Sequence, residues 1–331
     1  MYKSRPLTEL LRYVIHQKRK TEVLIETERI QKALLHSDQI VDIHHLNNAC
    51  PATYGDYLEV LMFARLLALN GLQIRFFLIA LSTPHGNWKT LSYNERIDFE
   101  LEQQKLAEII LPSNVTFRFI SNCDVAPTYS PDFVIFESRL RENSPNYDLV
   151  PALLHELIRR GVFVIPQNFL LSSNWISVPN QEPVIGWHVR DGLWETHRNQ
   201  GRKSVTKDFL QIRKMFPNDS IMIFSSPSGI SKTMAILCES KLLHAAHLDG
   251  VKVLEQPEPG FTNALRYVLS SKFYFQRLGG GIGIVPIFSS IPFIMLSGDE
   301  NYYFRRSGTK LVPWSRRDQI FLVRPISAGT R

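Results

Sequence analysis

The sequence has few cysteines, and they are not clustered. Its 331 residues include only Cys50, Cys123 and Cys238, which lie far apart. A disulfide framework uses an even number of cysteines and a zinc site uses closely spaced ligands, so the pattern argues against both. Such sparse use of cysteine is typical of a reducing compartment, and we expect the protein to be cytoplasmic.

Long apolar runs are missing as well. No stretch approaches the about 20 apolar residues of a membrane span. Residues 1–20 mix apolar and charged side chains, so they lack the apolar centre of a secretory signal. A helix with one apolar face is predicted instead by the spacing of Leu7, Leu10, Leu11, Val14 and Ile15. Two interpretations remain open for it: packing on the first domain, or peripheral contact with a membrane through its basic flanks.

The chain has no strong excess of one charge and no nucleic-acid motif. Its formal net charge is +7, and its basic residues are scattered. This modest positive charge favours anionic partners such as a nucleotide or a phosphorylated acceptor, and we expect no nucleic-acid partner. The sequence leaves the oligomeric state open.

The length and the hydrophobic content of 44% suffice for two domains. Strand-like apolar runs alternate with helix-like stretches in both halves, which predicts an α/β fold with parallel sheets. We expect four parts in chain order: an N-terminal helical leader over 1–37, an N-terminal domain over 38–166, a linker over 167–182, and a C-terminal domain over 183–331.

Individual elements follow from periodicity and from turn residues. The predicted strands are 39–46, 72–81, 116–120, 132–136, 162–165, 184–189, 221–224, 251–254, 273–275 and 291–296. The predicted helices are 57–70, 94–110, 148–160, 206–216, 231–244 and 260–269, with a short one at 282–289.

The stretch Pro183–Gly192, PVIGWHVRDG, begins as an apolar strand and ends in His188, Arg190 and Asp191. In open α/β sheets, ligands bind outside the carboxyl ends of the strands. An arginine there stays charged and can donate two hydrogen bonds to a phosphate. The alternative is a strand followed by a turn, with Arg190 and Asp191 merely solvated.

A glycine run, Gly279, Gly280 and Gly281, follows the strand predicted at 273–275. Glycine lets the backbone approach a ligand closely, and a helix N-terminus after it favours phosphate. The run is not a triphosphate-binding loop, because the Lys-Ser/Thr pair of that motif is missing. A structural turn is the alternative; together with Arg190, the run indicates a diphosphate site.

One carboxylate of the N-terminal domain, Asp56, is the candidate general base. Asp56 stands at the start of the strongly apolar helix predicted at 57–70, where it is either the helix N-cap or a base that deprotonates an acceptor hydroxyl. Asp42 and His44, on the strand before it, are the reserve candidates. There is no Asp-x-Asp motif, so we expect no obligatory divalent metal and no cofactor.

Three stretches together carry a family resemblance. They are Ile185–Arg190 (IGWHVR), Ile221–Ser226 (IMIFSS) and Leu269–Leu296 with its glycine run. The chain resembles GT-B glycosyltransferases, and among them the fucosyltransferase-like superfamily; Gly55–Ala68 also looks like the first loop and helix of such proteins. The resemblance implies two Rossmann-like domains facing a cleft, with the acceptor on the N-terminal domain and a nucleotide sugar, by preference a GDP-sugar, on the C-terminal one.

The resemblance also implies roles for single residues. Arg190 would bind the donor diphosphate together with the Gly279–Gly281 amides, beside Ser225 and Ser226. Glu255 lies where such folds contact base and ribose, although a solvated loop carboxylate is the alternative. His188 would join Asp56 and Arg190 in the catalytic set.

These observations predict a metal-independent glycosyltransferase acting on a glycan or glycoconjugate. Two alternatives stay open: another transferase of the same architecture, such as a polysaccharide pyruvyl transferase, or a non-catalytic protein that keeps the fold to bind a nucleotide or glycan.

Overall fold

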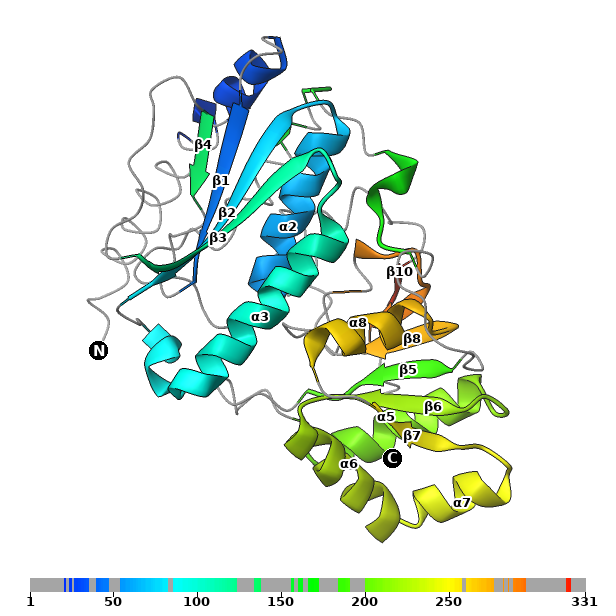
Figure 1. Ribbon diagram of the computed structural model, residues 1–331. Helices are drawn as coiled ribbons and strands as arrows, with labels where there is room; N and C mark the ends of the chain where they lie inside the picture. Colours follow the sequence, from blue (N-terminus) through cyan, green and yellow to red (C-terminus); the bar gives the residue numbers. More distant parts are fainter. Residues whose placement is uncertain are drawn as a thin grey trace, which may run out of the picture. The chain divides into compact units, whose positions relative to one another are not determined.

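The computed structural model describes residues 21, 24–25, 27–35, 40–47, 54–82, 86–123, 134–137, 156–157, 160–162, 166–172, 184–190, 200–257, 260–276, 282, 285, 288–295 and 320–322. The chain divides into two compact units (Figure 1), of which the first includes Asp56–Phe169 and the second Leu170–Arg305. Each unit holds a parallel sheet together with helices, so the architecture is the α/β fold with two Rossmann-like units that the sequence predicts.

Within the described residues, the first unit has a four-stranded parallel sheet ordered β3-β2-β1-β4. Its strands are β1 (Ile40–Leu46), β2 (Gln73–Leu81), β3 (Val115–Cys123) and β4 (Val134–Glu137). The helices are α2 (Tyr54–Leu69), α3 (Tyr93–Ile110) and the 3-10 turns Gly86–Thr90 and Gln167–Phe169, and residues 27–35 are helical as well. The strand predicted at 162–165, most of the helix predicted at 148–160 and the amphipathic helix of the first 20 residues lie outside the described part.

Helix α2 is mostly apolar, and most of its described side chains are buried. Arg65 is a charged residue among these buried side chains. Its guanidinium donates to the carbonyl oxygens of Ile110 at 2.9 Å, Phe169 at 3.1 Å and Asn168 at 2.5 Å. Burial lowers the pKa of Arg65 to about 10, so it keeps its charge at neutral pH and fastens α2 to the last residue of α3.

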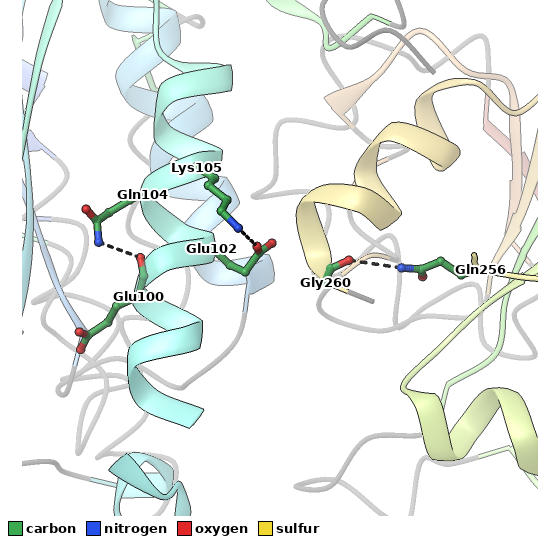
Figure 2. A network of polar contacts seen from close by, with 6 residues as sticks. All are labelled: Glu100, Glu102, Gln104, Lys105, Gln256 and Gly260. Carbon is green, nitrogen blue, oxygen red and sulfur yellow. Dashed lines mark hydrogen bonds and ion pairs between the residues drawn. The ribbon is translucent and has the colours of Figure 1, made fainter. Parts of the chain in front are cut away.

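Helix α3 shows how local sequence sets a helix boundary. Ser92 and Glu95 form a capping box: the Ser92 hydroxyl accepts from the Glu95 amide, and the Glu95 carboxylate accepts from the Ser92 amide. Farther along the same helix, Lys105 pairs with Glu102 at 2.8 Å (Figure 2). The predicted start at Asn94 is therefore correct to within one residue.

In the described part of the second unit, six parallel strands are ordered β10-β9-β8-β5-β6-β7. They are β5 (Ile185–His188), β6 (Ile221–Phe224), β7 (Val253–Glu255), β8 (Phe273–Gln276), β9 (Phe293–Met295) and β10 (Ile320–Leu322). The chain moves outward from β5 to β7, crosses back to β8 beside β5, and moves outward again to β10. This is the strand order of the doubly wound dinucleotide-binding fold.

The core of the second unit forms where the apolar strand residues meet α5 (Arg202–Met215), α6 (Pro227–Glu239) and α7 (Leu242–Leu248). Its fully buried members include Ile185, Trp187, Phe209, Ile212, Ile221, Ile223, Leu237 and Phe275. Helix α8 (Phe261–Leu269) precedes β8 and buries Phe261, Thr262, Ala264, Leu265, Val268 and Leu269. Alternation along β5 directs Ile185 and Trp187 into this core and leaves Gly186 and His188 for the other face of the sheet.

Several details differ from the sequence prediction. Helix α5 begins at Arg202 rather than Thr206, and helix α6 begins at Pro227 rather than Ser231. The single helix predicted at 231–244 is two helices, because Lys241 adopts a left-handed backbone conformation, φ 58°, between α6 and α7. Strand β8 extends to Gln276, one residue beyond the predicted strand, and β10 is an additional strand.

Candidate functional site

The strand order of the second unit reverses between β5 and β8, because the chain builds the sheet outward in opposite directions from that pair. In doubly wound sheets, ligands bind at this switch point, outside the carboxyl ends of the strands. His188 is the last residue of β5 and Gln276 the last residue of β8, and the two are partners in the parallel register. The fold therefore brings two polar side chains together where such folds bind their ligands.

Both side chains are buried, with 6% of His188 and 1% of Gln276 exposed. Among the described residues, His188 Nδ1 and both amide atoms of Gln276 are buried polar atoms that make no hydrogen bond. Nearly all buried polar atoms in native proteins have a partner, and each one left without costs about 1–3 kcal/mol. A cluster of three such atoms at the switch point indicates a site that a bound ligand completes.

His188 is neutral under physiological conditions. Burial, reinforced by the nearby positive charge of Arg190, lowers the pKa of its imidazole to about 4. An imidazole with this pKa is a weak base at pH 7, which disfavours the catalytic role that the sequence suggested. The same ring remains a good hydrogen-bonding group for a neutral ligand.

Arg190 lies two residues beyond the end of β5 and is only partly buried. Its backbone is fixed by Gln200: the Arg190 amide donates to Gln200 Oε1 at 2.9 Å, and the Gln200 amide donates to the Arg190 carbonyl at 3.0 Å. Gln200 in turn donates from Nε2 to the buried carboxylate of Asp208 on α5 at 2.7 Å. This clamp holds the residue predicted to bind phosphate.

The sequence prediction missed the clamp. Gln200 lies between the strand predicted at 184–189 and the helix predicted at 206–216, and no role was predicted for it. A signal for Asp208 was present, because it occupies an apolar-face position of α5 beside Val205, Phe209 and Ile212. A carboxylate on the buried face of a helix needs a polar partner, and Gln200 supplies it.

Ser225 and Ser226 follow β6, the neighbour of β5, so they lie at the same carboxyl edge as His188 and Arg190. Ser226 is the N-cap of α6, where its hydroxyl accepts from the Gly229 amide at 3.1 Å. The Ser225 hydroxyl is a buried atom without a hydrogen bond in the described structure. The positive end of the α6 dipole also lies here, and it favours an anion.

Glu255 ends β7, an edge strand, and its side chain is exposed. It shares the carboxyl edge with the other candidates but stands two strands away from β5. Next to it, the Gln256 side-chain amide donates to the Gly260 carbonyl at 3.3 Å (Figure 2). Gly260 has φ 101°, a conformation that strongly favours glycine.

Other candidates fall partly or wholly outside the described residues. Asp191 and the run Gly279–Gly281 are among them. The backbone of Asp56 is described, but its side chain is not. Because α2 begins at Tyr54, Asp56 lies inside the first helical turn, so the prediction that it is the N-cap is wrong.

Asp42 and His44, the reserve candidates for the general base, both contact other side chains of the first unit. Arg75 on β2 donates from Nε to Asp42 Oδ1 at 2.7 Å and from a terminal nitrogen to Oδ2 at 2.6 Å. Both carboxylate oxygens of Asp42 thus contact one guanidinium, an arrangement that holds strands together. His44 is buried, and its ring centroid lies 4.7 Å from that of Phe77.

A separate basic depression of about 610 Å³ lies along α5 and is open to solvent. Its lining residues are Arg202, Lys203, Thr206, Lys207, Leu210 and Ser240. None of the predicted site residues lines it. It is a second place where an anion could bind, and binding experiments need to tell the two apart.

The described residues contain neither a metal-ligand cluster nor a membrane-spanning helix. No group of three or more His, Cys, Asp or Glu side chains is arranged to hold a metal ion. No helix in the same part of the chain has the length and apolar character needed to cross a membrane.

Comparisons with known proteins add a likeness in overall architecture. No protein-family model matches the chain, and neither does a curated protein. Similar solved structures include ADP-heptose LPS heptosyltransferase II of E. coli, with 13% identity, 87% of this chain and 91% of that chain covered, and a TM-score of 0.45. A family 9 glycosyltransferase from Veillonella parvula has 11% identity, coverages of 87% and 86%, and a TM-score of 0.44. A UDP-GlcNAc 2-epimerase from Methanocaldococcus jannaschii has 10% identity, coverages of 86% and 89%, and a TM-score of 0.41. Similarities of this size assign neither a substrate nor a reaction.

Proposed function

We propose that the protein is a glycosyltransferase that takes a sugar from a nucleotide-sugar donor and transfers it to a glycan or glycoconjugate acceptor. The observation that carries the proposal is the carboxyl edge of the six-stranded sheet at its switch point. Three features follow or end the neighbouring strands β6, β5 and β8 there. They are the clamped Arg190, the N-terminus of α6, and the buried polar atoms of His188 and Gln276 that make no hydrogen bond.

The donor diphosphate would bind at Arg190. Its guanidinium can donate two hydrogen bonds to a phosphate, and the Gln200 clamp positions its backbone in advance. Ser225, Ser226 and the first turn of α6 would add hydrogen-bond donors and a favourable dipole. The Gly279–Gly281 amides, which follow β8 in the sequence, would complete the phosphate contacts.

The reaction divides between the two units. The acceptor hydroxyl oxygen forms a bond to the anomeric carbon of the sugar, and the bond from that carbon to the phosphate oxygen breaks. The leaving nucleoside diphosphate takes the electron pair, and Arg190 stabilises its charge. Asp56, on the N-terminal unit, would accept the hydroxyl proton as general base.

Several features of the proposal rest on the family resemblance. A GDP-sugar is the favoured donor, and the reaction proceeds without a metal ion. We further propose a cytoplasmic location, with peripheral membrane contact through the N-terminal helix.

Ligand screening is the first test. Thermal shifts with GDP, UDP, CMP and ADP identify the nucleotide, because a ligand that binds only the native state raises its melting temperature. Incubating the protein with the matching nucleotide sugars, with and without acceptor, then measures release of nucleoside diphosphate. Binding without turnover would favour the non-catalytic alternative.

Arg190 variants then locate the site. We expect Arg190→Ala to weaken nucleoside-diphosphate binding by about 1.5–3 kcal/mol, roughly 10–150-fold in Kd, and Arg190→Lys to restore part of it. Arg213→Ala is the matched control, because Arg213 lies in the last turn of α5 and pairs with Asp249, the residue after α7, at 3.1 Å. Unchanged affinity in Arg190→Ala, or a comparable loss in Lys207→Ala, would place the ligand elsewhere, the latter in the basic depression.

A further inference from the structure

We propose that His188 and Gln276 together bind a hydroxyl-bearing, uncharged part of the donor, its ribose or its transferred sugar, rather than its phosphates. This inference rests on the proposed function and assigns a distinct role to two residues of the same site. The pair would act as the specificity determinant beside the anion-binding Arg190.

Geometry places the two side chains next to each other. His188 and Gln276 are register partners on parallel neighbours, and adjacent strands lie about 4.8 Å apart. Register partners point to the same face of a sheet. The side chains of His188 and Gln276 therefore project from the same face as Gly186 and Tyr274, which lie two residues earlier on the two strands. The Tyr274 ring packs closely over Gly186, so the surface of the sheet at these two residues is already covered. A ligand therefore has to approach His188 and Gln276 from the carboxyl edge of the sheet.

The available hydrogen-bonding groups match a diol. Gln276 offers one amide NH₂ as donor and one carbonyl oxygen as acceptor, and His188 offers Nδ1, all without partners among the described residues. A hydroxyl group both donates and accepts, so two neighbouring hydroxyls can satisfy all three atoms. A phosphate oxygen accepts only, and it would leave the Gln276 carbonyl buried without a partner.

Charge points the same way. The imidazole of His188 has its pKa lowered to about 4 by burial and by Arg190, so it carries no charge to attract a phosphate at pH 7. Gln276 is neutral at every pH. The edge thus divides into a cationic part at Arg190 and a neutral, buried polar part at the switch point.

The test removes the hydrogen bonds of Gln276 without changing its length, using Gln276→Met. Binding of three probes is measured by calorimetry on the full chain: inorganic pyrophosphate, the nucleoside diphosphate selected by thermal shift, and its nucleotide sugar. We expect pyrophosphate affinity to stay within about twofold and the affinity for the hydroxyl-bearing probe to fall about 5–30-fold or more. A loss already seen with the nucleoside diphosphate identifies the ribose, and a loss seen only with the nucleotide sugar identifies the transferred sugar.

Stability without ligand supplies a second measurement. If the Gln276 amide has no partner in the free protein, Gln276→Met keeps or raises the melting temperature while it weakens binding. The matched control is Gln103→Met, which alters an equally buried glutamine in the first unit and leaves binding unchanged. His188→Asn, which keeps a polar atom near the position of Nδ1, should bind better than His188→Leu.

The outcomes separate this inference from the proposed function. Equal affinity of Gln276→Met and the unaltered protein for all probes would overturn the inference alone. So would an equal loss for pyrophosphate, or a marked fall in melting temperature with binding retained. Failure of the unaltered protein to bind any of the four nucleotides would remove the proposed function and this inference with it.

Discussion

The ring of Tyr274 occupies the space that a side chain at Gly186 would need. A Cβ atom placed on Gly186 would come within 2.5 Å of Tyr274 Cδ2 and 3.0 Å of the Ser271 hydroxyl. The two residues are register partners on β5 and β8, and Tyr274 is fully buried. The glycine in the IGWHVR stretch is therefore required by the neighbouring strand.

We expect Gly186→Ala to lower the free energy of unfolding by about 1–3 kcal/mol, because the buried Tyr274 ring has to move. Urea denaturation measures the change. Gly201→Ala is the control, since nothing lies within 4 Å of its Cβ position and its φ is −86°, which alanine adopts freely. That variant creates no clash, so it should lose clearly less stability than Gly186→Ala, about 1 kcal/mol or less, because alanine caps α5 less well than glycine. Equal stability of the two variants would contradict the packing described.

His188 should make the stability of the fold depend on pH. Burial lowers its pKa from 6.5 to about 4, so between these values the unfolded chain binds a proton that the native state does not. The stabilisation is fully present above about pH 6.5 and is lost as the pH falls toward 4, by at most about 1.4 kcal/mol per unit. Urea unfolding of His188→Asn from pH 7 to pH 4 should lack this part of the slope. Parallel curves for variant and unaltered protein would contradict a buried neutral imidazole.

Asp42 should matter for stability rather than for ligand binding. Removing its charge leaves Arg75 without its bidentate partner, and we expect Asp42→Asn to lower the free energy of unfolding by about 1–3 kcal/mol. Calorimetry with the selected nucleotide should show unchanged affinity. A stable Asp42→Asn variant that has lost turnover would instead return Asp42 to the list of candidate bases.

Asp56→Asn tests the proposed general base. Losing a base should lower turnover by at least about a hundredfold with donor affinity unchanged. Since Asp56 lies in the first turn of α2, the lost charge also weakens its interaction with the helix dipole, by about 0.3–1 kcal/mol. Turnover within a few-fold of the unaltered protein would assign Asp56 to the helix alone.

Much of the fold could be predicted because the elements are locally encoded. Strand β6 has the predicted bounds, Ile221–Phe224, since four apolar residues stand between polar ones. The break between α6 and α7 could not be predicted, because a lysine at position 241 gives no sign of a left-handed conformation. Strand β10 was missed because it is only three residues long and pairs with β9 alone among the described strands.

The candidate site could be predicted only in part, for a similar reason. A polar residue at the end of an apolar run can be recognised in the sequence alone. This signal identified His188, Arg190, Ser225 and Ser226 one by one. Which of them lie together depends on strand order, which no local pattern encodes. Gln276 lies just beyond the strand predicted at 273–275, and its pairing with His188 follows only from the register of β5 and β8.

The strand order also determines when the ligand-binding edge forms during folding. β5 pairs with β6 after a short crossover, whereas β8 reaches it only after β6, α6, α7, β7 and α8 have been synthesised. Closing a loop of roughly 90 residues is slow compared with local pairing. Until β8 arrives, the apolar strand β5 is an unprotected edge, and edges of this kind are where aggregation begins. Slower synthesis of the chain between β5 and β8 lengthens this exposure, so it should lower the yield of the native protein.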